Sequence, residues 1–312
     1  SAQQSNVTAY GATAVAIISL EAFAGICINA FLVCVLCTAW VKKKTLNSNE
    51  KILLLLGCSR FCSLCLSWVY YFLSIIYPNY LYVHPTFQIT AFFQSSSSCF
   101  TLWISACLCV FYCIKIANFR NRFFIYLKGK IDRIVPWLLL GSGLSALAIG
   151  ITSYDIADKM LINSHNYTRQ GNVLKLSYKT DEYLFHIYFI YGLGYVTSST
   201  AAVISALLLL FSLWRHKCKM QKNSMDNLSM DAHIKAMKSI FSFLVMYSIN
   251  FIFLILSLIP STKEEKYVGF LSLLFLHAFP SFHSLILILS NPKLEKTLIR
   301  ILSCVKCKVC MK

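Results

Sequence analysis

Residues 11–40 read GATAVAIISLEAFAGICINAFLVCVLCTAW, a run of 30 mostly apolar residues with one charged side chain, Glu21. A helix that crosses a bilayer needs about 20 such residues. Runs of this length exclude a membrane β-barrel, whose strands alternate over about ten residues. Comparable runs follow at 52–76, 86–116, 135–156, 183–214, 234–259 and 267–290. The sequence therefore predicts an all-α membrane protein, a seven-transmembrane helix bundle spanning residues 11–290.

The composition supports the same fold class. Of the 312 residues 57% are hydrophobic and only 13% are charged, against about 25% charged in soluble domains. A chain so poor in charge could not cover the surface of soluble domains, so apolar side chains must face lipid. The 14 cysteines do not suggest a disulfide scaffold, because ten of them lie within the apolar runs.

Charge placement predicts the orientation of the bundle. The segments 42–51, 115–135, 215–238 and 292–312 hold 22 Lys and Arg residues against five acids, so they carry the whole net charge of +17. The positive-inside rule places them in the cytoplasm, with residues 1–10 outside and 291–312 inside. A charge of +17 would suggest nucleic acid in a soluble protein. In a membrane protein it indicates topology and attraction to anionic lipid, so membrane lipids or sterol are expected partners and nucleic acid is not.

The tail and the loops carry candidate modification sites. Apolar residues recur at helical spacing in the tail and predict an amphipathic helix on the inner leaflet: Leu294, Leu298, Ile301, Leu302 and Val305. The spacing of Cys304, Cys307 and Cys310 would suit a metal, but no His or fourth Cys completes a site. Palmitoylation of these cysteines and plain free thiols both stay open. Asn166 begins a glycosylation sequon in an outer loop.

Seven helices suit a receptor, a transporter or channel, or an intramembrane enzyme. No zinc-protease motif or nucleophile pattern is present, so we expect no catalytic residue, metal site or cofactor. Charges inside the runs are sparse, Glu21 and Arg60 above all, and no half of the chain repeats the other. A transporter is therefore less favoured than a receptor.

The end of the third run identifies a family. Residues 111–119 read FYCIKIANF and resemble the F-Y-x-x-K-I-A-N-F stretch of the type 2 taste receptors, the bitter taste receptors among the G-protein-coupled receptors. Further matches, in the order expected for the family, are Asn29, Ser59-Arg60, the segment 211–216, the segment 233–239, and Pro280 to Ser284 followed by Asn291-Pro292. A vomeronasal type 1-like or orphan chemosensory receptor is the alternative, although the inner-loop motifs of the vomeronasal receptors are not seen.

The resemblance implies that small bitter molecules bind in the outer half of the bundle. Pockets of this kind are mostly apolar with a few polar groups. The residues expected at the site by this resemblance are Tyr71, Gln94, Ser95, Ser97, Ser98, Trp103, Tyr188, Tyr191, Asn250, Leu254, Leu273, Leu276 and His277.

Three positions depart from the family pattern. Gln94 stands where many members have Trp, Asn250 where an aromatic ring is common, and Leu273 where an acid or amide is frequent. The missing Trp removes a cation–π contribution of about 0.5–2 kcal/mol, and the missing acid argues against ammonium alkaloids. We expect a pocket for neutral or amide-bonding molecules.

The resemblance also implies coupling to a heterotrimeric G protein of the gustducin/Gi class at the plasma membrane. Asn29 and Arg60 would form an inner polar hub with Ser284 as a partner. Tyr112, Lys115, His216 and Lys238 would line the opening for the G protein, although positive-inside flanking alone could explain both lysines.

Overall fold

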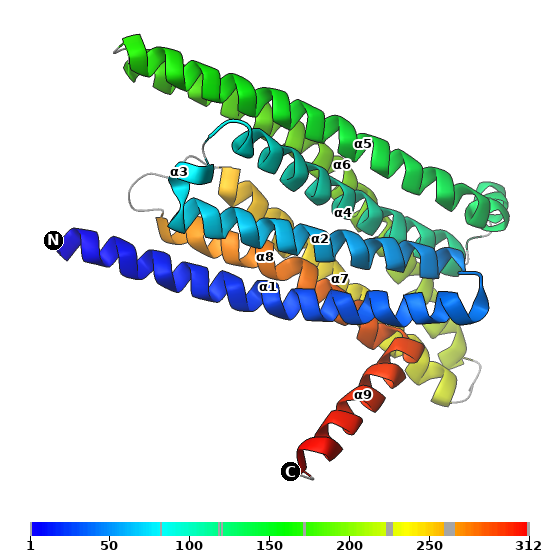
Figure 1. Cartoon of the computed structure of the whole chain (residues 1–312). Coiled ribbons are helices and arrows are strands. Elements are labelled where there is room, and N and C mark those ends of the chain that lie inside the picture. The colour runs from blue at the N-terminus through cyan, green and yellow to red at the C-terminus, as the bar shows by residue number, and fades with distance from the viewer. Residues whose placement is uncertain are drawn as a thin grey trace.

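The structure, a computed structural model, describes the side chains of residues 13–162, 192–218, 237–253 and 271–303, apart from positions 78, 79, 82, 118, 120, 239, 272 and 273. Its helices are α1 (Ala2–Lys43), α2 (Ser48–Ile76), α3 (Pro78–Leu81), α4 (Thr86–Ile116), α5 (Arg122–Gln170), α6 (Val173–Lys222), α7 (Asn227–Leu258), α8 (Lys266–Ser290) and α9 (Pro292–Cys310). Figure 1 shows the long helices running side by side as a bundle, with α9 leaving it at one end.

Helix length and apolarity fit a bilayer. Within the described residues, the segments long and apolar enough to cross a membrane are Thr13–Lys43, Ser48–Ile76, Thr86–Ile116, Arg122–Ile162 and Gly192–Cys218. The described parts of α7 and α8 add the apolar segments Ile240–Phe253 and Leu274–Ser290. The seven long helices α1, α2, α4, α5, α6, α7 and α8 therefore agree with the predicted bundle.

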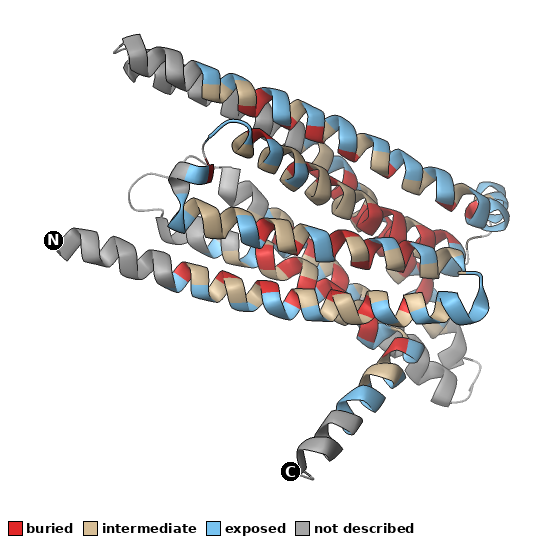
Figure 2. Ribbon diagram, in the orientation of Figure 1, coloured by how far each residue is buried: buried red, intermediate tan, exposed pale blue. Residues whose placement is uncertain are grey.

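The helices close into a ring. Contacts run from α1 to α2, then to α4, α6, α7 and α8, and from α8 back to α1, while α5 packs outside on α4 and α6. The buried residues gather at the centre of this ring, and α5 is exposed along much of its length (Figure 2). Leu56, Leu108 and Ile288 belong to the largest apolar cluster, which joins α2, α4 and α8. Helix α4 therefore lies between α2 and α6 in the ring and also carries the contact with α5.

Close packing of α1 depends on a glycine. A Cβ added at Gly25 would lie 2.7 Å from Leu64 Cδ1 of α2 and would also collide with Ser281 of α8. Small residues let helix backbones approach in membranes, where no hydrophobic force draws helices together. Gly25 therefore fixes how closely α1 approaches its two neighbours.

Most of the long helices run beyond the apolar segments predicted for them, and α5, α6 and α7 do so by at least seven residues at their N-terminal ends. The predicted segment 135–156 lies within α5, which begins at Arg122, and α6 and α7 also begin before residues 183 and 234. Hydropathy marks only the residues suited to hydrocarbon. A helix can continue into water because its backbone hydrogen bonds are internal.

The end of the bundle where α1 meets α2, α4 meets α5, and α8 meets α9 is here called the basic end, since it holds residues 42–51, 115–135 and 291–303. Lys44 ends α1 in the left-handed conformation, with φ of 59°. Asn291 starts α9 by accepting a hydrogen bond from the Lys293 backbone N–H at 3.1 Å, and Pro292 suits the first helical position. The axis turns by 101° between α8 and α9.

Candidate functional site

A buried arginine lies at the centre of the bundle. Arg60 of α2 is 0% exposed. Its Nη1 donates to Ser284 Oγ of α8 at 2.8 Å, and its Nη2 donates to Ser105 Oγ of α4 at 3.1 Å. Nη2 also pairs with His283 Nδ1. We call Asn29, Arg60, Ser105, His283 and Ser284 the polar hub.

The polar hub reaches α1 through Asn29. Ser284 Oγ donates to Asn29 Oδ1 at 2.7 Å, and Asn29 Nδ2 donates to the Gly25 carbonyl oxygen at 2.8 Å. Arg60, Ser284 and Asn29 are thus brought together as one hydrogen-bonded chain. With Ser105 bound to Arg60, the polar hub links α1, α2, α4 and α8.

Aromatic rings join the polar hub to α7. The His283 ring lies 4.6 Å from the Phe243 ring and 6.1 Å from the Tyr247 ring, centroid to centroid. Within the described residues no carboxylate forms an ion pair with Arg60. A buried charge is costly unless its hydrogen bonds are satisfied, so the position of Arg60 depends on acceptors from α4 and α8. Movement of α7 or α8 would therefore disturb the polar hub.

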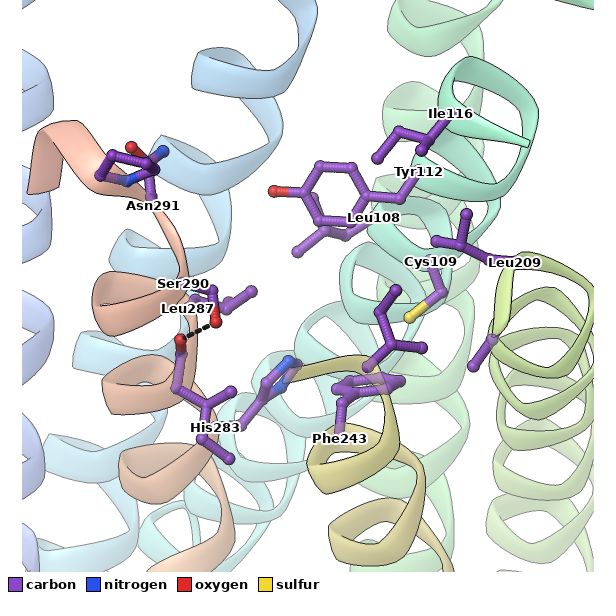
Figure 3. Close-up of a pocket in the computed structure, with 14 residues that line it drawn as sticks. Leu108, Cys109, Tyr112, Ile116, Leu209, Phe243, His283, Leu287, Ser290 and Asn291 are labelled. Atoms are coloured by element: carbon purple, nitrogen blue, oxygen red, sulfur yellow. Dashed lines mark hydrogen bonds between the residues drawn. The ribbon is translucent and has the colours of Figure 1, made fainter. Parts of the chain in front are cut away.

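A cavity opens between the polar hub and the basic end. It measures about 320 Å³ and is lined by α4, α6, α7 and α8. The Tyr112 ring extends from α4 toward α8, while Phe243 and His283 lie deeper in the bundle (Figure 3). Ser290 and Asn291 line it at the α8–α9 junction. We call it the inner cavity.

The predicted basic residues do not share the inner cavity. Lys115 Nζ pairs with Asp132 Oδ2 of α5 at 2.6 Å. This hydrogen bond lowers the pKa of the Asp132 carboxyl, which precedes the apolar stretch 135–156. Lys238 lines a separate groove beside Phe211, and His216 is exposed on α6. Of the four residues expected at the opening, Tyr112 is the one that lines this cavity.

Polar side chains also meet in the opposite half of the bundle. Gln94 Nε2 of α4 donates to Ser67 Oγ of α2 at 2.7 Å. Gln94 Oε1 is buried, and no donor in the described part of the protein reaches it. The Tyr71 ring of α2 meets the His277 ring of α8 edge to face, with centroids 4.7 Å apart. We call Ser67, Tyr71, Gln94 and His277 the outer cluster.

Other residues expected at the ligand site are spread around the outer cluster. Ser95 and Ser97 direct their hydroxyls to backbone oxygens of α4, at Ala91 and Gln94. Trp103 lines a groove against α5 together with Trp137. Asn250 is buried on α7, and Ser98 and Leu276 are half-buried.

Several predicted residues lie outside the described side chains: Tyr188, Tyr191, Leu254, Leu273, Asn166, Cys304, Cys307 and Cys310. Among the side chains that are described, no three His, Cys, Asp or Glu residues gather in a way that could hold a metal ion.

The sequence did not single out three parts of this arrangement. Ser105 and His283 bind Arg60, and Ser67 binds Gln94. Serines in membrane helices are common packing residues, so neither serine stood out. The spacing of Ser105, Cys109 and Tyr112 at i, i+4 and i+7 could have indicated one inward face of α4.

Comparisons with known proteins agree with these features. The sequence model of the family described as Taste receptor protein (TAS2R) matches residues 7–306. The chain is 31% identical to taste receptor type 2 member 123 of Mus musculus, over 93% of the chain and 92% of that protein. It is 34% identical to member 102 of Rattus norvegicus (94% and 88% covered). It is 31% identical to member 2 of Homo sapiens (93% and 95% covered).

The fold also matches a solved receptor. Squid rhodopsin superposes with a TM-score of 0.61 at 11% identity, covering 96% of this chain and 87% of that one. The likeness confirms the all-α seven-helix fold, and the relatives confirm the family indicated by residues 111–119. The chain therefore belongs to the type 2 taste receptor family, whose members are G-protein-coupled receptors for bitter compounds and not enzymes.

Proposed function

We propose that this receptor resides in the plasma membrane with its basic end in the cytoplasm. The charge distribution supports this orientation, because residues 42–51, 115–135 and 291–303 at the basic end hold 13 Lys and Arg residues against three acids, and basic loops stay inside. The outer cluster then lies in the extracellular half of the bundle, and the inner cavity faces the cytoplasm.

The outer cluster is the proposed site for a small bitter molecule. The observation that carries this assignment is Gln94 Oε1, a buried amide oxygen without a donor among the described residues. An unpaired buried acceptor costs about 1–3 kcal/mol, so a ligand N–H or O–H in this position would gain that energy. The neighbouring Tyr71 and His277 rings supply apolar surface. These groups favour a neutral ligand with one hydrogen-bond donor.

The inner cavity is the proposed docking site for a heterotrimeric G protein of the gustducin/Gi class. Its lining by Tyr112, Leu209 and Leu287 is apolar, and it lies at the end of the bundle that we place in the cytoplasm. Agonist binding shifts the population of a state that already exists. The contacts of His283 with Phe243 and Arg60 would carry the shift from the outer half to α7 and α8.

The ligand assignment is tested by calcium mobilisation in cells that express the receptor with a promiscuous chimeric G protein. A bitter-compound panel first identifies an agonist with an N–H donor, and its N-methyl analogue is then compared. Gln94→Leu should reduce the potency of the N–H agonist about tenfold, the loss of one buried hydrogen bond. The N-methyl analogue should keep its potency on both receptors.

Thr152→Ala serves as the control, since the Thr152 hydroxyl bonds to its own helix on the exposed side of α5. If Gln94→Leu reduces the potency of both agonists equally, with surface expression intact, the proposed hydrogen bond is contradicted. An equal loss on Thr152→Ala would show that the effect is not specific to the outer cluster.

A further inference from the structure

A further groove, at the basic end, has no part in the proposed ligand and G-protein sites. It measures about 460 Å³ and lies between α1, α2 and α5. Its lining includes Trp40, Lys44, Lys51, Leu54, Leu55 and Leu139. We call it the basic groove.

Each helix presents one face to the basic groove. Lys51 and Leu55 are four residues apart on α2, so they share a face of that helix. Lys44, just past the end of α1, lines the groove together with Trp40, and its backbone N–H donates to the Trp40 carbonyl oxygen at 2.7 Å. The left-handed turn at Lys44 ends α1 at this point. The two lysines and Thr45 thus line the basic groove together with apolar side chains.

Neither lysine has an acidic partner in the described part of the chain. Glu50, next to Lys51, is held by Lys43 at 3.4 Å and by Lys293 at 3.3 Å. Asp132, one turn before Pro136, is engaged by Lys115. No Asp or Glu lines the basic groove. Two ammonium groups thus remain available to an external anion.

The apolar part of the basic groove faces the bilayer. Trp40 is 52% exposed and its neighbour Val41 is 78% exposed, and exposed apolar side chains on a spanning helix contact lipid. Tryptophan is enriched where the acyl region meets the headgroups. Lysine stems lie along apolar surface while the ammonium reaches the headgroup region.

We propose that the basic groove binds an anionic phospholipid of the cytoplasmic leaflet. Lys44 and Lys51 hold the anionic headgroup, and one acyl chain lies over Leu54, Leu55 and Leu139. The leaflet assignment rests on the proposed orientation, in which the basic end is cytoplasmic. Charge complementarity selects an anionic over a zwitterionic lipid, because a basic residue near the surface contributes about fivefold in affinity.

Native mass spectrometry of the purified full-length receptor tests the proposal, with phosphatidylserine, phosphatidylinositol 4,5-bisphosphate and phosphatidylcholine titrated separately. The double variant Lys44→Gln with Lys51→Gln should bind the two anionic lipids about 30-fold more weakly. The matched control is Lys42→Gln with Lys130→Gln, which removes the same charge from the same end but from outside the groove. The affinity of this control variant for the two anionic lipids should fall by less than about threefold. Phosphatidylcholine should bind weakly to all forms.

A third variant distinguishes lipid binding in the basic groove from general attraction to the positive surface. Leu55→Trp keeps both lysines and fills the apolar part, so it should also weaken anionic lipid binding. It decides the question if the lysine variant fails to fold, as judged by size-exclusion chromatography. Equal losses in the two double variants, unchanged binding in Leu55→Trp, or tight phosphatidylcholine binding would each overturn the proposal. The measurement uses no bitter compound and no G protein, so its outcome is separate from that of the proposed ligand and G-protein sites.

Discussion

Replacing Ser284 with alanine should destabilise the receptor by breaking the polar hub at its middle. The hydroxyl accepts from Arg60 at 2.8 Å and donates to Asn29 at 2.7 Å. Interhelical hydrogen bonds in membranes contribute about 0.6–1.7 kcal/mol each, so the loss of two should cost about 1–3 kcal/mol. Arg60 would keep Ser105 and His283. We therefore expect lower stability with the fold retained.

The assay is the temperature at which half of the agonist-free receptor, heated in detergent, remains monodisperse by size-exclusion chromatography. A cost of about 1–3 kcal/mol corresponds to a fall of roughly 3–10 °C in Tm. Ser248→Ala is the matched control, because the Ser248 hydroxyl is exposed and bonds at 3.0 Å to its own helix. It should change Tm by about 1 °C or less.

A double-mutant cycle with Asn29→Ala tests whether the two residues act together. Ser284→Ala should lower Tm less in the Asn29→Ala receptor than in the unaltered receptor, because the hydrogen bond between Ser284 and Asn29 is already absent there. If Ser284→Ala is no more harmful than Ser248→Ala, or if the two effects add in full, the polar hub does not hold the helices as described.

Three further predictions follow from individual contacts. Gly25→Ala should lower Tm by an amount equivalent to about 1–3 kcal/mol, because the added Cβ overpacks the junction of three helices. The control Gly192→Ala adds a Cβ in open space, so it should leave Tm unchanged or slightly raised. Tyr112→Ala should slow agonist-stimulated nucleotide exchange without changing agonist affinity; a change in affinity alone would contradict its place in the inner cavity. Asp132→Asn should alter the free energy of unfolding by less than about 1 kcal/mol, because its pair with Lys115 is exposed. Since Lys115 lowers the pKa of Asp132, this small stabilisation is present above the ordinary value of 3.8 and is lost as the pH falls through the lowered pKa, which a pH series of Tm measurements checks.

Apolar run length was enough to predict the helices, because the bilayer imposes one minimum length on all of them. The rotation of each helix about its axis was harder to predict. Lys115 and Lys238 were expected at one opening, yet Lys115 contacts α5 and Lys238 lines a groove beside Phe211. The positive-inside rule predicts at which membrane face a basic residue lies, but not which neighbouring helix its side chain faces. Successive residues in a helix are rotated by about 100° about its axis, so the facing side depends on the exact rotation of the helix.

Hydrogen-bond partners that lie far apart in the sequence were also hard to predict. Arg60 attracts attention in the sequence because a charge in an apolar run is costly. Its partners Ser105 and His283 lie 45 and 223 residues away and carry no comparable signal. Family resemblance placed Asn29 and Ser284 beside Arg60, and the structure brings these three together. For Gln94, sequence comparison showed an unusual residue, but only the structure showed its unpaired oxygen.

In the proposed mechanism, a ligand at the outer cluster activates a G protein through the inner cavity. The most direct measurement is nucleotide exchange on a purified Gi-class heterotrimer by receptor in nanodiscs, with and without the agonist from the panel. Leu287→Trp, which fills the inner cavity, should abolish agonist-stimulated exchange while agonist binding to Gln94 is kept. Agonist-stimulated exchange at the unaltered rate in Leu287→Trp, with normal receptor amounts, would show that the G protein does not dock in the inner cavity.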